Sequence, residues 1–282
     1  MEKRTVDAEY IRQLLPVRNP ETHKGDYGKI LLLCGSRGYT GAAALAAMGA
    51  LRSGAGVVYL MVPESIYTIE AVKLWEAVVI PALDENGMLA SSAVEEIMAY
   101  LPKMDAVLIG PGLGQSEGTF TAVRTVLEHY SGPVVVDADG INVLSGHKDI
   151  LRGRTAPTIL TPHMGEFMRI GGKNTSDIAK AVEELAMELN CIVLLKGHRT
   201  VITDGNICFI NETGNAGMAT GGSGDVLSGI IVSLLGQGLD PLDAAACGAY
   251  LHGASGDLAA EQIGQYGMLP QDMLNFLPRL LP

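Results

Sequence analysis

The stretch from Asn215 to Asp225 is the part of the chain best suited to hold a phosphate. Glycine and other small residues fill it, and an apolar run from Val226 to Leu235, predicted to be helical, follows without a break. The first turn of a helix leaves backbone N–H groups unpaired and carries the positive end of the helix dipole, and glycines let an anion approach closely. The stretch therefore predicts an anion site at the start of a helix.

The carboxylate of Asp225 ends this loop, where it would repel a phosphate. It could cap the helix, or it could take a proton from a hydroxyl group that attacks phosphorus. Phosphoryl transfer needs a phosphate cradle and such a base together. A glycine turn with a capping Asp is the structural alternative. The length of the loop, and the further capping residues Thr220 and Ser223, favour phosphoryl transfer with Asp225 as catalytic base.

Two common phosphate motifs are absent from the sequence. It contains no G-x-x-x-x-G-K-[ST] stretch, and no strand, G-x-G-x-x-G and helix unit with a following acidic residue. The segment from Gly110 to Gly114 comes closest, but Pro111 interrupts the pattern. We interpret it as a second phosphate or substrate loop, with a plain tight turn as the alternative.

Three polar residues follow the short apolar run from Val134 to Val136. Asp137, Asp139 and Asn142 offer hard oxygen ligands, and their spacing alone would allow a metal site. Short motifs of this kind are weak indicators of metal binding. Stabilisation of a turn with Gly140, or orientation of a substrate, is the favoured interpretation.

Short apolar runs alternate with longer Ala-rich and Leu-rich stretches, which predicts an α/β fold with a mostly parallel central sheet covered on both faces. The expected strands are Lys29 to Cys34, Gly56 to Val62, Ala106 to Ile109, Val134 to Val136, Thr158 to Leu160 and Ile192 to Leu195; the expected helices are Gly41 to Ser53, Thr175 to Leu189 and Asp225 to Leu235. Ligands of such sheets lie beyond the carboxyl ends of the strands, so Lys196 is placed to contact phosphate or ribose unless it is an ordinary strand-end lysine. A hairpin of Val201 to Thr203 and Asn206 to Ile210 is expected to close one edge of the sheet.

Composition limits the class of protein. The 282 residues, 48% hydrophobic and without repeats or linkers, predict one domain over residues 1–282. A formal net charge of −11 disfavours binding to nucleic acid or to anionic membranes. Four cysteines far apart in the sequence predict reduced thiols, and no apolar run is long enough to span a membrane, so a cytoplasmic protein is expected.

Six ordered blocks resemble a known family, the nucleotide-dependent NAD(P)H-hydrate dehydratases of the ribokinase-like superfamily. The blocks are Gly28–Ile30 with Gly35–Ser36 and Tyr39–Ala43, Ile109–Gly114, Asp137–Asn142, Leu160–Glu166, Lys196–Thr200 and Gly221–Asp225. The similarity runs from about Gly28 to Gly253 and implies a ribokinase-like three-layer α/β/α fold. It also implies dehydration of the S epimer of hydrated NADH or NADPH, through phosphorylation of the ring hydroxyl by ADP or ATP and loss of phosphate.

The resemblance also implies roles for single residues. The nucleotide would contact Lys196, Gly197, His198, Arg199, Thr200, Gly222, Ser223 and Gly224. The hydrated nicotinamide would lie among Ala43, Gly114, His163 and Asp225. For His163, satisfaction of a backbone carbonyl is the structural alternative.

Mg²⁺ is the expected cofactor, because it would neutralise phosphate charge that this acidic chain does not balance. Glu166 is the candidate to hold its water shell, and a helix-capping role is the alternative for the same residue. The resemblance further suggests a homo-oligomer. About 28 residues before the first strand are too few for an N-terminal epimerase domain, so a separate NAD(P)H-hydrate epimerase is an expected partner.

Two other functions stay open at this level. A small-molecule kinase of the same superfamily, of the hydroxyethylthiazole or hydroxymethylpyrimidine type, would have the same fold and the same Asp225. The segments Thr161 to Glu166 and Gly110 to Gly114 resemble the dehydratases more closely. A nucleotide-binding regulatory protein is the third possibility, although a sensor has no need of a catalytic base.

Overall fold

The computed structural model describes residues 2–15 and 17–282. Its strands are β1 (Glu2–Thr5), β2 (Lys29–Leu33), β3 (Val57–Pro63), β4 (Val78–Ala82), β5 (Asp84–Glu85), β6 (Met88–Leu89), β7 (Ala106–Ile109), β8 (Val134–Val136), β9 (Thr158–Leu160), β10 (Ile192–Leu195), β11 (Thr200–Thr203) and β12 (Ile207–Asn211). Its helices are α1 (Ala8–Leu14), α2 (Thr40–Arg52), α3 (Glu64–Lys73), α4 (Val94–Tyr100), α5 (Glu117–His129), α6 (Asp139–Val143), α7 (Lys148–Arg152), α8 (Met164–Arg169), α9 (Ile178–Leu189), α10 (Ser223–Gly236), α11 (Pro241–Ile263) and α12 (Pro270–Phe276). Short 3₁₀ helices lie at Lys24–Tyr27, Ser91–Ala93, Leu101–Lys103, Ala216–Met218 and Leu277–Leu280.

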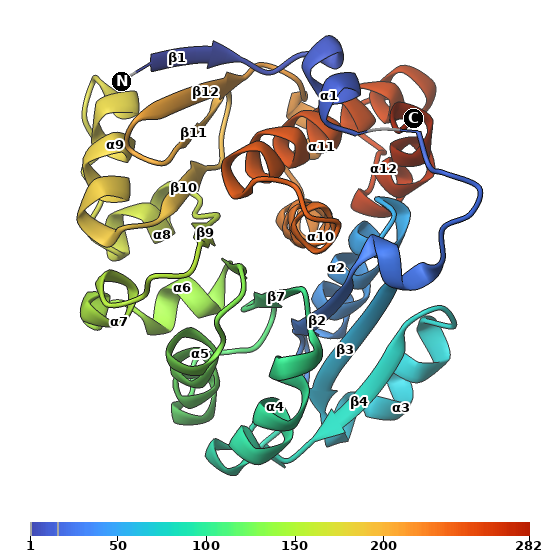
Figure 1. The fold of residues 1–282 in the computed structure, drawn as a ribbon, viewed down its shortest axis with the longest axis vertical. Helices are drawn as coiled ribbons and strands as arrows, with labels where there is room; N and C mark the ends of the chain where they lie inside the picture. The colour runs from blue at the N-terminus through green and yellow to red at the C-terminus, as the bar shows by residue number, and fades with distance from the viewer. Residues whose placement is uncertain (1, 16) are drawn as a thin grey trace.

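One large sheet runs through the molecule in the order β1-β12-β11-β10-β9-β8-β7-β2-β3-β4 (Figure 1). Neighbouring strands are parallel except for the β10, β11 and β12 meander, which is antiparallel. The expected hairpin is therefore confirmed, but it does not close the sheet. Strand β1 pairs in parallel with β12 outside it, so β1 forms that edge and β4 forms the other.

Helices cover both faces of the sheet and create two apolar cores (Figure 1). Helices α2, α10, α11 and α12 pack on one face, while α4, α5 and α9 pack on the other. Successive side chains of a strand point to opposite faces. In β2, accordingly, Ile30 and Leu32 enter the first core and Leu31 and Leu33 the second. This confirms the predicted α/β/α layers.

Helix α10 lies against α2 at close range, because the residues at their contact are small. A side chain on Gly229 of α10 would bring a Cβ to 2.1 Å from the carbonyl oxygen of Ala46, so no larger residue fits there. The helix begins at Ser223, two residues before the predicted start, because Gly222 at φ +95° forms its N-cap. Helix α9 begins at Ile178, three residues after its predicted start, because Asp177 caps it.

The four cysteines are buried thiols and not members of disulfides, as expected. Among the described residues, no helix has the length and apolarity needed to cross a bilayer.

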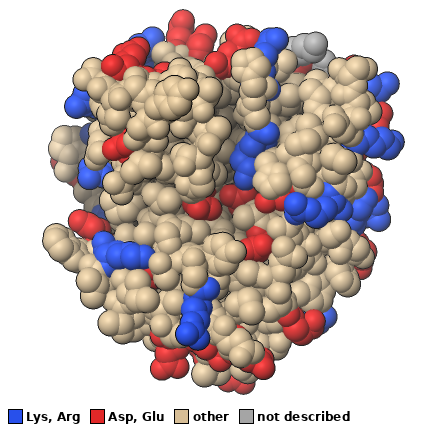
Figure 2. All heavy atoms as spheres, turned by 180° about the vertical axis from the view of Figure 1, so that it is seen from behind, with Lys and Arg blue, Asp and Glu red and all other residues tan. Residues whose placement is uncertain are grey.

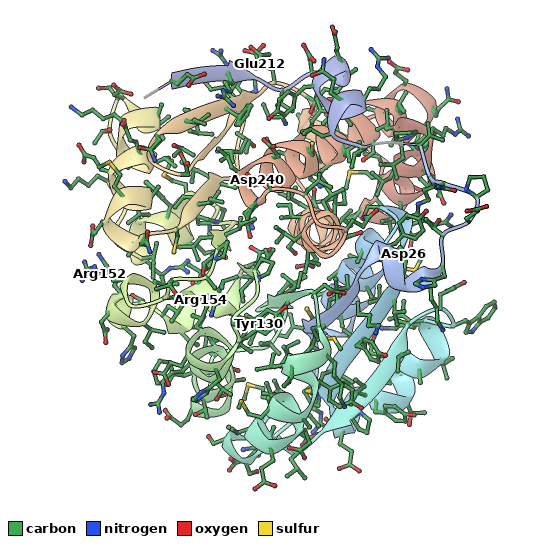
Figure 3. All side chains as sticks on the ribbon, viewed as in Figure 1. Asp26, Tyr130, Arg152, Arg154, Glu212 and Asp240 are labelled. Atoms are coloured by element: carbon green, nitrogen blue, oxygen red, sulfur yellow. The ribbon has the colours of Figure 1, made fainter. Side chains whose placement is uncertain are left out.

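A buried arginine joins the amino ends of β8 and β9, whereas the predicted site lies at the carboxyl ends of the strands. The Arg154 guanidinium, in a residue that is 6% exposed, donates to the carbonyl oxygens of Leu127, Tyr130 and Gly132 and to the hydroxyl of Thr158 (Figure 3). Burial lowers the pKa of this group below its usual range. Its donors satisfy carbonyls that would otherwise be buried without partners.

We expect Arg154→Met to lower the free energy of unfolding by about 3–5 kcal/mol, because a side chain of similar length would leave three carbonyl groups unpaired. Equilibrium denaturation in urea measures the change. Arg152→Met is the matched control, because its ion pair with Glu188 lies at the surface and should contribute at most about 1 kcal/mol. Equal losses in the two variants would contradict a structural role for the buried guanidinium.

Candidate active site

The carboxyl ends of five neighbouring strands meet at one edge of the sheet, as the fold class predicted. Backbone hydrogen bonds connect their loops: Gly35 N–H to the Pro111 carbonyl, Asp137 N–H to Ile109, Thr161 N–H to Val136, and Lys196 N–H to Pro162. These bonds fix loops from β2, β7, β8, β9 and β10 side by side. Residues far apart in the sequence thus form one surface.

Helix α10 points its first turn at this surface. The backbone N–H groups of Gly224 and Asp225 lie in that turn and have no preceding turn to pair them, whereas the N–H of Ser223 donates to the Thr220 carbonyl at 3.4 Å. The two unpaired amides suit the predicted anion site. The N-cap Gly222 has no side chain to occupy the site. The capping interpretation of Asp225 is wrong, since Asp225 lies inside the helix and the cap makes no side-chain hydrogen bond.

A cleft of about 830 Å³ opens beside the first turn of α10. Most of the residues predicted for the nucleotide line it, namely Lys196, Gly197, His198, Arg199, Thr200, Ser223 and Gly224. His163, which the resemblance placed with the nicotinamide, lines this cleft as well. Gly222, Asp225, Ala43 and Gly114 lie outside its lining.

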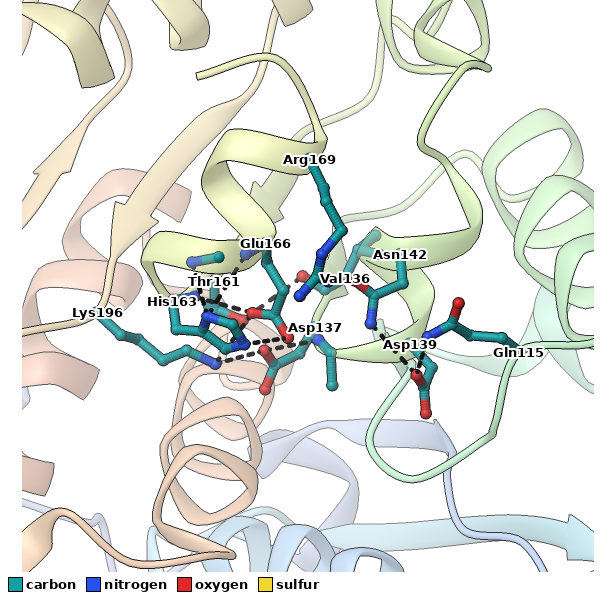
Figure 4. A network of polar contacts seen from close by, with 12 residues as sticks. Gln115, Val136, Asp137, Asp139, Asn142, Thr161, His163, Glu166, Arg169 and Lys196 are labelled. Atoms are coloured by element: carbon teal, nitrogen blue, oxygen red, sulfur yellow. Dashed lines mark hydrogen bonds and ion pairs between the residues drawn. The ribbon is translucent and has the colours of Figure 1, made fainter. Parts of the chain in front are cut away.

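The Lys196 ammonium is held at the floor of the site by carboxylates. Its Nζ lies 2.8 Å from Oδ1 of Asp137 and 3.9 Å from Oε2 of Glu166, and its side chain is 20% exposed (Figure 4). Burial lowers the pKa of Lys196, but Asp137 and Glu166 more than offset that effect, so the pKa lies above its usual value. The lysine is therefore a fixed positive charge beside the anion site.

The Asp225 carboxylate is different, because it has no hydrogen-bond partner in the described part of the chain. Its backbone carbonyl accepts from Ser228, but its side chain does not pair. The pKa of this carboxyl is raised to about 7: burial is the main cause, Asp137, Asp139 and Glu166 contribute to the rise, and Lys196 opposes it. A carboxyl with a pKa near neutrality suits a general base.

Figure 2 shows the molecule from behind the view of Figure 1, with acidic side chains gathered in the hollow at the middle of that face and basic side chains around them. Among the described residues, no three His, Cys, Asp or Glu side chains form a group able to hold a metal ion. The spacing of Asp137, Asp139 and Asn142 therefore does not produce a metal site by itself. Instead Oδ2 of Asp139 accepts the N–H of Gly114 at 2.9 Å, which supports the favoured role in stabilising a turn.

His163 and Glu166 form the start of α8. His163 Nδ1 accepts the N–H of Gly165 at 2.9 Å and that of Glu166 at 3.4 Å, while the Glu166 carboxylate accepts the N–H of His163 at 2.8 Å. This reciprocal capping box confirms the capping role for Glu166. The structural alternative for His163, a bond to a backbone carbonyl, is wrong, since its Nδ1 accepts from amides.

Ala43 and Gly114 lie on the α2 side of the site. Ala43 is fully buried in the first turns of α2, and its Cβ would lie 2.8 Å from a Cβ added to Gly35. Leu45, half a turn further along α2, packs over Gly222 and so joins this region to the start of α10. The two groups of predicted residues therefore flank α10, with Asp225 on its first turn.

Sequence reasoning missed the far wall of the cleft. Residues Asn211, Thr213, Ala249, His252 and Gly253 line it, from the end of β12, the loop after it and α11. His252 Nε2 lies 3.2 Å from Oγ of Ser223, and burial lowers its pKa to about 4, which leaves a neutral ring. Helix α11 carries no motif, so nothing in its sequence pointed to the site.

Comparison with known proteins gives a consistent result. The family model of NAD(P)H-hydrate dehydratase matches residues 30–279. The bifunctional NAD(P)H-hydrate repair enzyme Nnr of Moorella thermoacetica is 45% identical over 99% of this chain and 54% of its own length, so the chain spans about half of that relative. The ADP-dependent (S)-NAD(P)H-hydrate dehydratase of Bacillus subtilis is 36% identical, over 96% of this chain and 95% of its own. The structure of the ADP/ATP-dependent NAD(P)H-hydrate dehydratase from Bacillus subtilis, co-crystallised with ATP and Mg²⁺, superposes with a TM-score of 0.83 at 35% identity and covers 97% of this chain and 96% of its own.

The raised pKa of Asp225 predicts a pH-dependent cost to stability. A carboxyl with a pKa of about 7 in the folded state and an ordinary one when unfolded holds its proton more tightly when folded, so stability falls as pH rises between about 4 and 7. We expect Asp225→Asn to be about 2–4 kcal/mol more stable than the parent above pH 7, with the difference disappearing below about pH 4. Thermal and urea unfolding across this range measure it. Asp149→Asn, at an exposed site on α7, should show no such pH-dependent gain.

Proposed function

Because this chain belongs to the NAD(P)H-hydrate dehydratase family, we propose that it dehydrates the S epimer of hydrated NADH or NADPH at the expense of ADP or ATP, and so restores the reduced coenzyme. One observation carries the proposal. The unpaired Asp225 carboxylate lies in the same helical turn as the anion-binding amides, with its pKa raised to about 7. A base and a phosphate cradle are thus fixed next to each other.

The geometry supports a two-step reaction. Asp225 takes the proton of the ring hydroxyl while the hydroxyl oxygen attacks the terminal phosphorus of the nucleotide. The bond from this phosphorus to the oxygen that bridges it to the next phosphate breaks, the shortened nucleotide leaves, and a phosphate ester of the ring forms. The ester C–O bond then breaks with help from the ring nitrogen, inorganic phosphate leaves, and loss of a neighbouring ring proton restores the double bond. Phosphorylation converts hydroxide, a poor leaving group, into phosphate, a good one.

The first turn of α10 and Lys196 stabilise the transferred group. The N–H groups of Gly224 and Asp225 point out of the helix start, and each good donor of this kind is worth about 2.7–4 kcal/mol to the transition state. The Lys196 ammonium lies against Gly224, 3.2 Å from the position of a Cβ on that residue. Both are placed to meet the negative charge that develops on the phosphoryl group.

The residues present fit Mg²⁺ that comes with the nucleotide rather than a resident metal. Both oxygens of the Glu166 carboxylate already contact His163, so this residue would hold water molecules of the ion and not the ion itself. Mg²⁺ keeps several waters and binds largely through phosphates, which agrees with the absence of a metal-ligand cluster in the described residues. Such an ion would neutralise charge on the nucleotide phosphates.

The S epimer must be supplied by a partner activity if the R epimer also forms. We propose an NAD(P)H-hydrate epimerase for that step. The support is that relatives twice the length of this chain are named bifunctional repair enzymes.

The experiment uses purified chain, Mg²⁺, the S epimer of NADPH hydrate and either ADP or ATP. We expect absorbance of the reduced nicotinamide to recover only when a nucleotide is present, with release of inorganic phosphate. Asp225→Asn should lower kcat by about 10²–10⁴-fold because the proton acceptor is lost, whereas Asp149→Asn should retain full activity. Accumulation of a stable phosphate ester, without recovery, would instead identify a kinase of the same superfamily.

The pH dependence gives a second test of the same base. Because Asp225 must be ionised to accept a proton and its pKa is about 7, kcat/KM should rise with pH and level off above neutrality. A profile that is flat between pH 5 and 8 would contradict the assignment of Asp225 as the base.

A further inference from the structure

Asp137 has no part in the steps described above, yet it is among the most buried charged groups of the site. The residue is 1% exposed, directly after β8. Its Oδ1 accepts two hydrogen bonds of 2.8 Å, one from Lys196 Nζ and one from the N–H of Ala138. Figure 4 shows Lys196 reaching across from β10 to this carboxylate.

The backbone around Asp137 is constrained to a conformation that few sequences allow. Ala138 has a φ of +49°, which is unfavourable for a residue with a Cβ. Gly110 approaches so closely that an added Cβ would lie 1.8 Å from the Asp137 carbonyl oxygen. Strain of this kind persists where the surrounding structure requires one position for a side chain.

Lys196 needs this partner because its own surroundings disfavour a positive charge. Its ammonium lies over Gly224, near the positive end of the α10 dipole, and burial opposes the rise in pKa that the nearby carboxylates cause. Glu166 is 3.9 Å away and is engaged in the capping box of α8. Asp137, at 2.8 Å, is the nearest carboxylate to Lys196 in the described residues.

We propose that Asp137 is a positioning residue: it holds the Lys196 ammonium at the first turn of α10, so that the lysine and the helix amides bind the same nucleotide phosphate. The inference rests on the proposed use of a nucleotide. Asp137 acts through Lys196 and not as a second base, because its carboxylate is already paired whereas that of Asp225 is not.

A double-mutant cycle on nucleotide affinity tests the proposal, with ADP and MgCl₂ titrated into the protein in a calorimeter. We expect Asp137→Ala to weaken ADP binding at least tenfold in the parent chain. In a Lys196→Ala background, the same change should alter the affinity less than twofold, because the residue it acts through is gone. A merely structural role would produce the same loss in both backgrounds.

Asp137→Asn separates geometry from charge and keeps the test valid if the alanine variant does not fold. Both observed hydrogen bonds end on Oδ1, which an asparagine can supply. We expect this variant to bind ADP with an affinity between those of the parent and Asp137→Ala, and its effect should also vanish in the Lys196→Ala background.

Glu70→Ala is the matched control, because Glu70 on α3 is another buried carboxylate paired with a lysine, at 3.0 Å from Lys73, outside the cleft. It should leave ADP affinity unchanged. Equal losses of ADP affinity from Asp137→Ala in the two backgrounds, or tighter ADP binding by Asp137→Ala, would overturn the positioning role. The proposed function would still stand in that case, provided that the wild-type chain is active. Failure of the wild-type chain to bind either ADP or ATP would remove the proposed function and this inference together.

Discussion

The near contact of α10 with α2 is the constraint on which the site depends. Gly229 brings the two helix backbones together at Ala46, and the apolar residues of α10 fill the core between α2 and the sheet. Because the helix cannot slide or rotate in such packing, its first turn is fixed at the carboxyl ends of β7 and β8. The amides proposed to bind the phosphate, and Asp225, therefore occupy set positions before any ligand binds.

The first turn of α10 lies among carboxylates, whose negative charge disfavours a bound phosphate unless nearby positive charge offsets it. Asp137, Asp139 and Glu166 lie close enough to Asp225 to raise its pKa, and a site so acidic would repel phosphates. The positive end of α10 and the Lys196 ammonium provide the opposing field at the phosphate itself. One group of carboxylates thus has two effects, since it raises the proton affinity of Asp225, the proposed base, and stabilises the charge of Lys196, the proposed phosphate ligand.

Much of the fold could be predicted from local sequence, because strands buried on both faces are apolar throughout. Strands β7, β8, β9 and β10 match their predicted bounds, and Asp137 and Lys196 directly follow two of them as expected. Strand β1 could not be predicted, because Glu2–Thr5 is short and charged, as exposed edge strands often are. The loops after the strands carried motifs, whereas His252 lies within a helix rich in alanine and glycine and reaches the site only through tertiary packing.

The pairing of Asp137 with Lys196 marks the limit of such predictions, since 59 residues separate them and each had a credible local role. The pairing also indicates where specificity must lie. Ser223, Gly224 and Asp225 share one rigid turn, so the cradle and the base would be the same in a kinase and in a dehydratase of this fold. The choice between keeping and expelling the phosphate would therefore depend on how the acceptor is held, on the α2 side where Ala43 and Gly114 are predicted to contact it. There the bond from Gly114 N–H to Asp139 fixes the loop that would face the ring, at a point which the phosphate-binding residues do not reach.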